Sequence, residues 1–95
     1  MPYTLVRHHV KDYDHWKTVF ASNALWRKAS GETHYYLFRD IDDQNLVTVM
    51  QEWDDLQQAH RFMRSEELKM RMAQAGVNEA PQIIFLEEME SSFKR

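Results

Sequence analysis

Four segments of the chain have the pattern of β-strands, and apolar positions recur at helical spacing in the longer segments between them. The four segments are rich in β-branched and aromatic residues and cover 3–10, 33–39, 45–53 and 82–89. Each of the two longest gaps between them holds apolar residues spaced three or four positions apart. The pattern therefore predicts the element order β-α-β-β-α-β.

The first helical pattern covers about residues 13–28. Asp12 or Asp14 can cap its start, and Ser30 and Gly31 can end it. One stripe of the expected helix carries, on it or beside it, Tyr13, Trp16, Val19, Phe20, Asn23 and Arg27. We expect one continuous helix here.

The second helical pattern starts after the Asp54 and Asp55 cap and carries a histidine among apolar residues. The positions i, i+3, i+4 and i+7 of one helical face are Leu56, Ala59, His60 and Met63. A titratable imidazole is therefore expected on an apolar stripe that faces the sheet.

The pattern restarts near Ser65, where the segment 65–68 (SEEL) can cap a further helical segment. We expect a break or kink at this point. Gly76 can end the second segment, and Pro81 prevents the helix from continuing. The run 83–86 that follows is entirely apolar, which is typical of a strand buried on both faces.

The predicted order is that of a split βαβ arrangement, a ferredoxin-like α+β fold with both helical segments on one face of a four-stranded antiparallel sheet. One domain, residues 1–95, accounts for the whole length. The sheet face without helices offers one of two apolar sets: Val6, Phe38, Leu46, Met50, Ile84 and Leu86, or Leu5, Leu37, Val47, Val49, Trp53, Ile83 and Phe85. Either set would expose more apolar area than a monomer usually does, so we expect a homodimer of stacked sheets.

Composition limits the classes of binding partner and the cellular compartment that we expect for this chain. The 12 basic and 15 acidic residues are mixed along the chain and give a net charge of −3, so no basic stripe is available to bind nucleic acid. The absence of cysteine fits a reducing compartment. No signal-peptide pattern and no run of about 20 apolar residues occurs, which excludes a membrane-spanning helix. We expect a cytoplasmic protein.

Five short motifs resemble the dimeric α+β-barrel superfamily, especially the antibiotic-biosynthesis-monooxygenase-like proteins. They are the segments 10–16 (VKDYDHW), 52–54 (EWD), 59–60 (AH) and 65–69 (SEELK), together with Pro81. The resemblance covers roughly residues 3–89. It implies a homodimer with a small-molecule pocket between sheet and helices. The family includes cofactor-independent oxygenases, haem-degrading enzymes, lactone isomerases and proteins with no known activity.

The resemblance carries over to individual positions unevenly. The tryptophan that ends the third strand matches Trp53, and the residue after the helical alanine matches His60. The asparagine of the oxygenase subgroup falls at about Val49, which has no amide. The tryptophan and histidine of the haem-degrading subgroup fall at Met63 and Met72, so haem degradation is not expected. No cofactor is predicted.

His60 is the candidate catalytic residue. Burial would lower the pKa of its imidazole and make it a general base toward an aromatic or enolic ligand. The alternative interpretation is a core histidine that makes one hydrogen bond. His60→Ala separates the two interpretations, because only the core role predicts a loss of stability with unchanged ligand binding.

The candidate ligand-binding residues are Trp53, His34, Tyr36, His8 and Trp16. Trp53 is either a stacking wall for a planar ligand or a core residue. His34 and Tyr36 share one face of a strand. They are either a pair of hydrogen-bond donors for a ligand or polar residues of an edge strand that point to solvent. His8 and His9 point to opposite faces, so they cannot close on one metal ion, and no metal site is predicted.

Two functions remain open from the sequence. The first is a small enzyme, of the cofactor-independent monooxygenase or the isomerase or cyclase kind, that acts on a small apolar or aromatic ligand by acid–base chemistry. The second is a non-catalytic ligand-binding or stress-associated dimer with the same fold. A closed cavity between helices and sheet, reached by His60 and at least one further polar group, would favour the enzyme.

Overall fold

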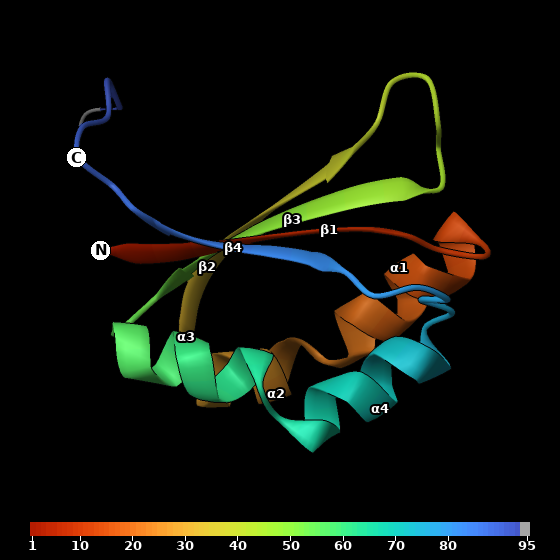
Figure 1. Ribbon diagram of the computed structural model, residues 1–95, viewed down its shortest axis with the longest axis horizontal. Coiled ribbons are helices and arrows are strands. Elements are labelled where there is room, and N and C mark those ends of the chain that lie inside the picture. Colours follow the sequence, from red (N-terminus) through yellow and green to blue (C-terminus); the bar gives the residue numbers. More distant parts are fainter. Residues whose placement is uncertain (94–95) are drawn as a thin grey trace.

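Four strands form one antiparallel sheet in the order β2-β3-β1-β4, and helices cover one of its faces (Figure 1). The computed structural model describes residues 1–93. The strands are β1 (Pro2–His9), β2 (Glu32–Arg39), β3 (Leu46–Trp53) and β4 (Gln82–Glu87). The helices are α1 (Tyr13–Ser22), α2 (Ala24–Ala29), α3 (Leu56–Met63) and α4 (Glu66–Gln74). The predicted ferredoxin-like α+β fold is confirmed.

Side-chain caps begin three of the helices where the sequence predicts them. Asp12 accepts a hydrogen bond from the backbone N–H of Asp14 at the start of α1. At the start of α3, Asp55 accepts a hydrogen bond from the backbone N–H of Gln58, and at the start of α4, Ser65 accepts one from that of Leu68. The second helical segment is therefore two helices, and the predicted break at Ser65 is confirmed.

The first helical segment is also divided, although one continuous helix was expected over residues 13–28. It breaks at Asn23, where α1 ends and α2 begins. Asparagine is a weak helix former because its side chain competes for hydrogen bonds. Here its Oδ1 accepts a hydrogen bond from Arg71 Nη1 of α4, so a contact between distant elements stabilises the break.

The two faces of the sheet divide the apolar residues differently from either expected set. Val6 lies opposite Val49 and Ile83, whereas Leu5 lies opposite Met50 and Ile84. Leu5 and Val6 were therefore assigned to the wrong sets. The inner face, which lies against the helices, includes Thr4, Val6, His8, Val47, Val49, Gln51 and Trp53, all of them buried. The outer face includes Leu5, Tyr36, Phe38, Leu46, Met50, Ile84 and Leu86.

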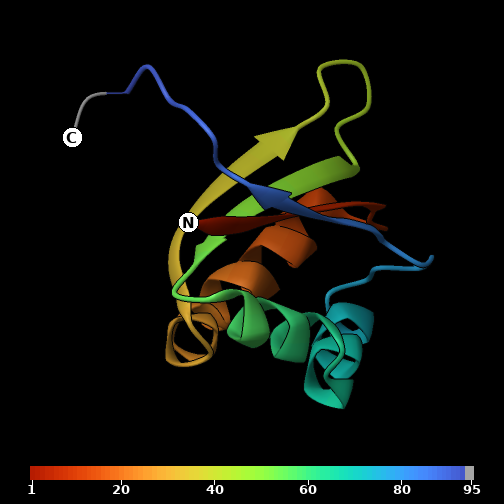
Figure 2. The same ribbon diagram turned by 60° about the vertical axis from the view of Figure 1, so that its left-hand side comes forward.

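Strand β4 lies at one edge of the sheet beside β1 (Figure 2). Burial on both faces was expected for it, but within this chain Ile84, Phe85 and Leu86 are 38%, 36% and 42% exposed. An edge strand has only one neighbour, and the helices reach the inner face only in part. Both faces of β4 are therefore partly exposed in the single chain, and an apolar run does not indicate how far the helices reach across an edge strand.

Candidate functional site

A cavity lies between the inner face of the sheet and the helices. The space inside it that the centre of a water-sized sphere can occupy is about 70 Å³. Most of its wall is apolar and comes from β1, β3 and all four helices. Five polar residues contribute to that wall: His8, Asn23, Arg27, Gln51 and Arg71. A mostly apolar cavity with a few polar groups is the usual form of a small-molecule site.

Aromatic rings form two parts of the wall. Trp16 and Phe20 of α1 stack with ring centroids 4.9 Å apart. Trp26 of α2 packs on Phe62 of α3 at 4.8 Å. These ring pairs make part of the wall apolar and aromatic.

His8 lies on the cavity wall because alternation along β1 directs it to the inner face. It is 4% exposed, and its Nδ1 is buried with no hydrogen-bond partner among residues 1–93. The Trp16 ring packs edge-on against it at 5.8 Å. Burial in these apolar surroundings lowers the pKa of His8 below its ordinary value of 6.5.

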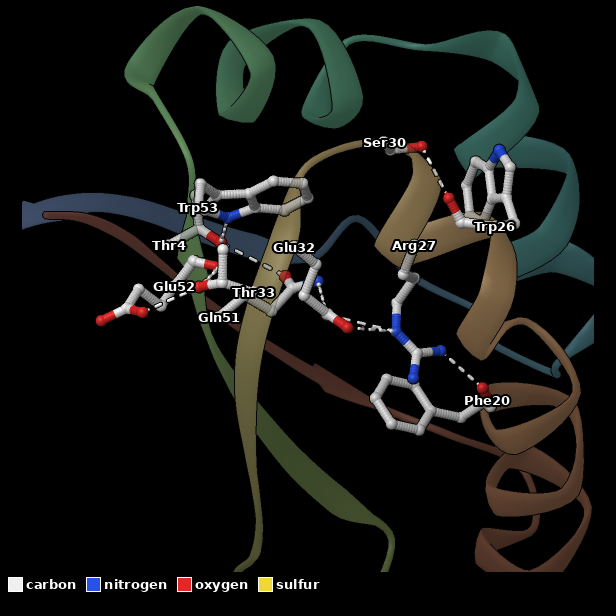
Figure 3. A network of polar contacts seen from close by, with 10 residues as sticks. All are labelled: Thr4, Phe20, Trp26, Arg27, Ser30, Glu32, Thr33, Gln51, Glu52 and Trp53. Atoms are coloured by element: carbon white, nitrogen blue, oxygen red, sulfur yellow. Dashed lines mark hydrogen bonds and ion pairs between the residues drawn. The ribbon is translucent and has the colours of Figure 1, made fainter.

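Arg27 enters the cavity wall from α2 and is 3% exposed (Figure 3). Its Nε lies 3.2 Å from both carboxylate oxygens of Glu32. Its Nη1 donates to the backbone carbonyl of Phe20, and its Cζ lies 3.7 Å from the centre of the Phe20 ring. Its Nη2 is buried and has no partner among residues 1–93.

A chain of hydrogen bonds connects Glu32 to the interior of the sheet (Figure 3). Gln51 Nε2 donates to Glu32 Oε2 at 2.8 Å, and Thr4 Oγ1 donates to Gln51 Oε1 at 3.2 Å. Trp53 Nε1 donates to Thr4 Oγ1 at 2.9 Å. Each donor faces toward Glu32, so the carboxylate that pairs with Arg27 is held by groups from β1 and β3 as well.

Arg71 of α4 lies in a less enclosed part of the wall, with 28% of its side chain exposed. Its Nε pairs with Glu67 at 3.0 Å, and its Nη1 donates to Asn23 Oδ1. Its Cζ lies 4.2 Å from the Trp26 ring. A second guanidinium therefore borders the cavity.

The structure brings only two of the six candidate site residues from the sequence to the cavity wall, His8 and Trp16. Trp53 is fully buried beside the cavity, where its ring packs on Phe62 at 4.9 Å. His60 is half-buried and stacks on Phe85 of β4, with ring centroids 4.1 Å apart, outside the cavity lining.

The remaining two candidates, His34 and Tyr36, lie on the outer face of β2 and do not reach the cavity. His34 Nδ1 lies 3.0 Å from Glu52 Oε1, which also accepts from Thr33 Oγ1 at 2.7 Å. The Tyr3 hydroxyl lies 2.9 Å from the other oxygen of Glu52 and 2.7 Å from Glu88 Oε1, and its one proton can serve either carboxylate. The Thr33 hydrogen bond, with those from Tyr3 and His34, lowers the pKa of Glu52. We call Tyr3, Thr33, His34 and Glu52 the outer cluster.

Sequence reasoning passed over Arg27 and Gln51 as site residues. Both stood in patterns that could have identified them: Arg27 lies on the predicted apolar stripe of the first helical segment, and Gln51 alternates with Val49 and Trp53. Among the polar residues on the predicted apolar helical stripes, only His60 is a predicted site residue. The rule that selects His60, a polar group at an apolar position, would have selected Arg27 too.

Two further observations concern the part of the chain that the structure describes. No three His, Asp or Glu side chains within residues 1–93 are arranged to hold a metal ion. None of the helices in that range is long and apolar enough to cross a membrane.

Residues 6–74 match the family described as Antibiotic biosynthesis monooxygenase. No curated protein compared with the sequence matches it. Among solved structures, the chain is similar to SnoaB, a cofactor-independent oxygenase from Streptomyces nogalater, with 15% identity over 98% of this chain and 97% of that one and a TM-score of 0.79. It is also similar to a conserved protein from Methanosarcina mazei Go1, with 14% identity, coverage of 92% and 91%, and a TM-score of 0.72. Identities this low show a shared fold alone.

Proposed function

Because the chain belongs to the antibiotic biosynthesis monooxygenase family, we propose that it is a small enzyme in which His8 removes a proton from an aromatic or enolisable ligand. The observation that carries the proposal is the unpartnered, buried Nδ1 of His8 on the wall of an apolar cavity. A histidine in the core of a protein normally has a hydrogen-bond partner. An imidazole without one is available to a ligand.

The pKa of His8 suits this role. Since burial lowers it below 6.5, the imidazole is neutral at pH 7 and can accept a proton. The stacked rings of Trp16 and Phe20 supply a flat surface for the ligand. The mostly apolar wall favours the neutral form of this base.

The chemistry needs no group beyond the ligand, the base and dioxygen. His8 takes a proton from an acidic C–H, and the electron pair of that bond remains on the ligand as an enolate. The enolate can return the proton at another carbon, which is an isomerisation. Alternatively it transfers electrons to O2, so that a CH2 group becomes a carbonyl and one oxygen atom leaves as water. The similarity to a cofactor-independent oxygenase supports the second course for an aromatic ligand.

A non-catalytic binding protein is the second candidate, and the small volume of the cavity, about 70 Å³, favours it. A narrow cavity can hold a small ligand tightly without leaving room for a second reactant. The two candidates differ in whether the bound ligand loses a proton.

Exchange of the acidic C–H protons of 2-indanone for deuterium in D2O tests the proposal directly. We expect the protein to accelerate exchange, followed by proton NMR, and His8→Phe to lower the accelerated rate by about 10²–10⁴-fold, the usual contribution of a general base. The rate should rise with pH and level off near or below the ordinary histidine pKa of 6.5, because the free base is the active form. Oxygen uptake with anthrone, measured on the same proteins, tests the oxidation step.

His60→Phe is the matched control, because it changes a half-buried imidazole that lies outside the cavity lining. It should leave exchange unchanged. Exchange that is lost in His60→Phe and kept in His8→Phe would transfer the role of the base to His60. Binding of 2-indanone with no acceleration of exchange would favour the binding protein.

The proposal includes a homodimer formed through the outer face. Tyr36, Phe38, Ile84 and Leu86 on this face are 48%, 52%, 38% and 42% exposed in the single chain. A second copy of the same face can cover these apolar side chains, because a two-fold interface brings identical patches together. Light scattering coupled to size exclusion should give twice the chain mass of 11.5 kDa. A folded species of 11.5 kDa would contradict the dimer.

A further inference from the structure

The pairing of Arg27 with Glu32 leaves part of the guanidinium unused. Both oxygens of Glu32 lie 3.2 Å from Nε, so the carboxylate does not take the usual fork of two different nitrogens. Nη1 is used by the Phe20 carbonyl. Nη2 remains without a partner among residues 1–93, on a side chain that is 3% exposed and lines the cavity.

The surrounding residues hold Arg27 in this position. Gln51 and Arg27 both donate to Glu32, and the Phe20 and Tyr35 rings lie 3.7 Å and 5.2 Å from Cζ. A side chain held by a carboxylate, a carbonyl and two rings has little freedom to move its third nitrogen to another acceptor. Glu32 and Gln51 act as positioning residues for it.

The charged side chains that line the cavity are both arginines, whereas their partners Glu32 and Glu67 lie outside the lining. Arg27 and Arg71 are both part of its wall, and no Asp or Glu from the described range lines it. Arg71 is the more exposed of the two, so it can attract an anion that approaches from solvent. Arg27 is the more deeply buried donor.

We propose that Arg27 selects the ligand, with Nη2 donating a hydrogen bond to an acidic oxygen of an aromatic compound, such as a carboxylate, phenolate or enolate. The cavity is then specific for oxyanions over neutral aromatic compounds of the same shape. This inference rests on the proposed function for the location of the ligand, and in an enolate it assigns the oxygen to Arg27 and the carbon to His8.

Equilibrium binding of benzoate and of benzamide, its neutral counterpart, tests the proposal without any reaction. The protein should bind benzoate about tenfold more tightly than benzamide in a calorimetric titration at pH 7, as expected when a charged hydrogen bond replaces a neutral one. Because Arg27→Gln alone would leave the Glu32 charge buried and unpaired, the variant to test is Arg27→Gln/Glu32→Gln. In that variant the two affinities should become equal.

Arg64→Gln is the matched control, since Arg64 is an exposed arginine outside the cavity lining, and it should keep the preference for benzoate. Benzoate and benzamide have no acidic C–H proton for His8 to remove, so a failure of the proposed base does not imitate a failure of Arg27. Equal affinities in the unmodified protein, or no binding of either probe at millimolar concentration, would overturn the proposal. So would a preference that survives in the folded double variant or disappears in Arg71→Gln alone.

Discussion

Two buried glutamates on opposite faces of the sheet show how differently the same degree of burial can be used. Glu32 is 7% exposed in the network on the cavity side, and Glu52 is 8% exposed in the outer cluster. Glu32 pairs with the permanent cation Arg27, which keeps one donor unused. Glu52 receives hydrogen bonds from Thr33 and Tyr3 and contacts His34, so its oxygens are satisfied within the chain.

The comparison separates a site for a ligand from a structural cluster. On the inner face, Nη2 of Arg27 and Nδ1 of His8 are buried without partners among residues 1–93, which is unfavourable unless another molecule supplies them. In the outer cluster the carboxylate is satisfied, while the apolar side chains around it stay exposed. On the inner face, two buried polar atoms therefore have no hydrogen-bond partner within residues 1–93. On the outer face, apolar side chains are not covered by other apolar groups of the chain.

The largest effect is expected from a charge on the outer face. Met50 lies in the middle of β3 opposite Leu5 and Tyr36, at the centre of the proposed dimer contact. Met50→Asp should prevent folding rather than release monomers, because an unpaired buried charge costs several kcal/mol and a small domain has only about 5–15 kcal/mol in total. Circular dichroism melts measure this, with Leu25→Asp, at a residue 82% exposed, as the control. A folded Met50→Asp monomer would mean that the chain folds without a second copy on its outer face.

The next effect distinguishes the two glutamates. Glu32→Ala should destabilise the protein by about 3–5 kcal/mol, because it leaves the Arg27 charge buried and unpaired. Glu52→Ala should cost only about 1–3 kcal/mol, because the groups it leaves behind are hydroxyls and an exposed histidine. Urea denaturation of both variants gives the two free energies of unfolding. Equal losses of stability in the two variants would show that a permanently charged partner does not raise the cost of removing a buried glutamate.

The smallest effect concerns the pH dependence of stability at two neighbouring histidines. His8 has its pKa lowered by burial, so its folded form stays neutral while the unfolded chain binds a proton below pH 6.5. Its contribution is complete above pH 6.5 and falls as the pH drops from there toward the folded-state pKa. His9 is the opposite case, since its hydrogen bond to Glu79 raises its pKa. Its contribution is complete below pH 6.5 and is lost as the pH rises through the folded-state pKa.

His8→Phe should therefore reduce the loss of stability between pH 6.5 and 5, measured by urea melts at each pH. His9→Gln serves as the comparison and should change only the behaviour above pH 6.5. If both variants altered the same pH range in the same direction, the two faces of β1 would not differ in the way described here.

Local signals in the sequence were sufficient for the elements and their order. Asp12, Asp55 and Ser65 are caps whose hydrogen bonds depend only on residues two or three positions away, so a single sequence contains all that is needed to predict them. The element order then favoured one topology, because few connections are compatible with it. The family resemblance agreed with that result and is confirmed by the match over residues 6–74.

The site was harder to predict because it depends on how each helix is rotated about its axis and on which residues of each strand face the helices. Local sequence patterns contain neither. The helical spacing around His60 is as expected, but the buried face of α3 is centred on Ala59, Phe62 and Met63. Leu56 is consequently 49% exposed, and His60 lies at the flank against Phe85. A periodic pattern shows which residues share a helical face and leaves the rotation of that face toward the cavity undetermined. Whether β1 presents Leu5 or Val6 to the helices likewise depends on its register with β3.

The central position of β1 has a consequence for the order of folding. This first strand pairs with β3 from the middle of the chain and with β4 from its end, whereas β2 and β3 are joined by a short turn (Figure 1). Closing a long loop costs more conformational entropy than closing a short one, so the β2–β3 hairpin should form early and β1 should be secured late. During synthesis β1 leaves the ribosome before both of its partner strands and has to wait for them. Pulse-labelled hydrogen exchange would detect this as late protection of its amides.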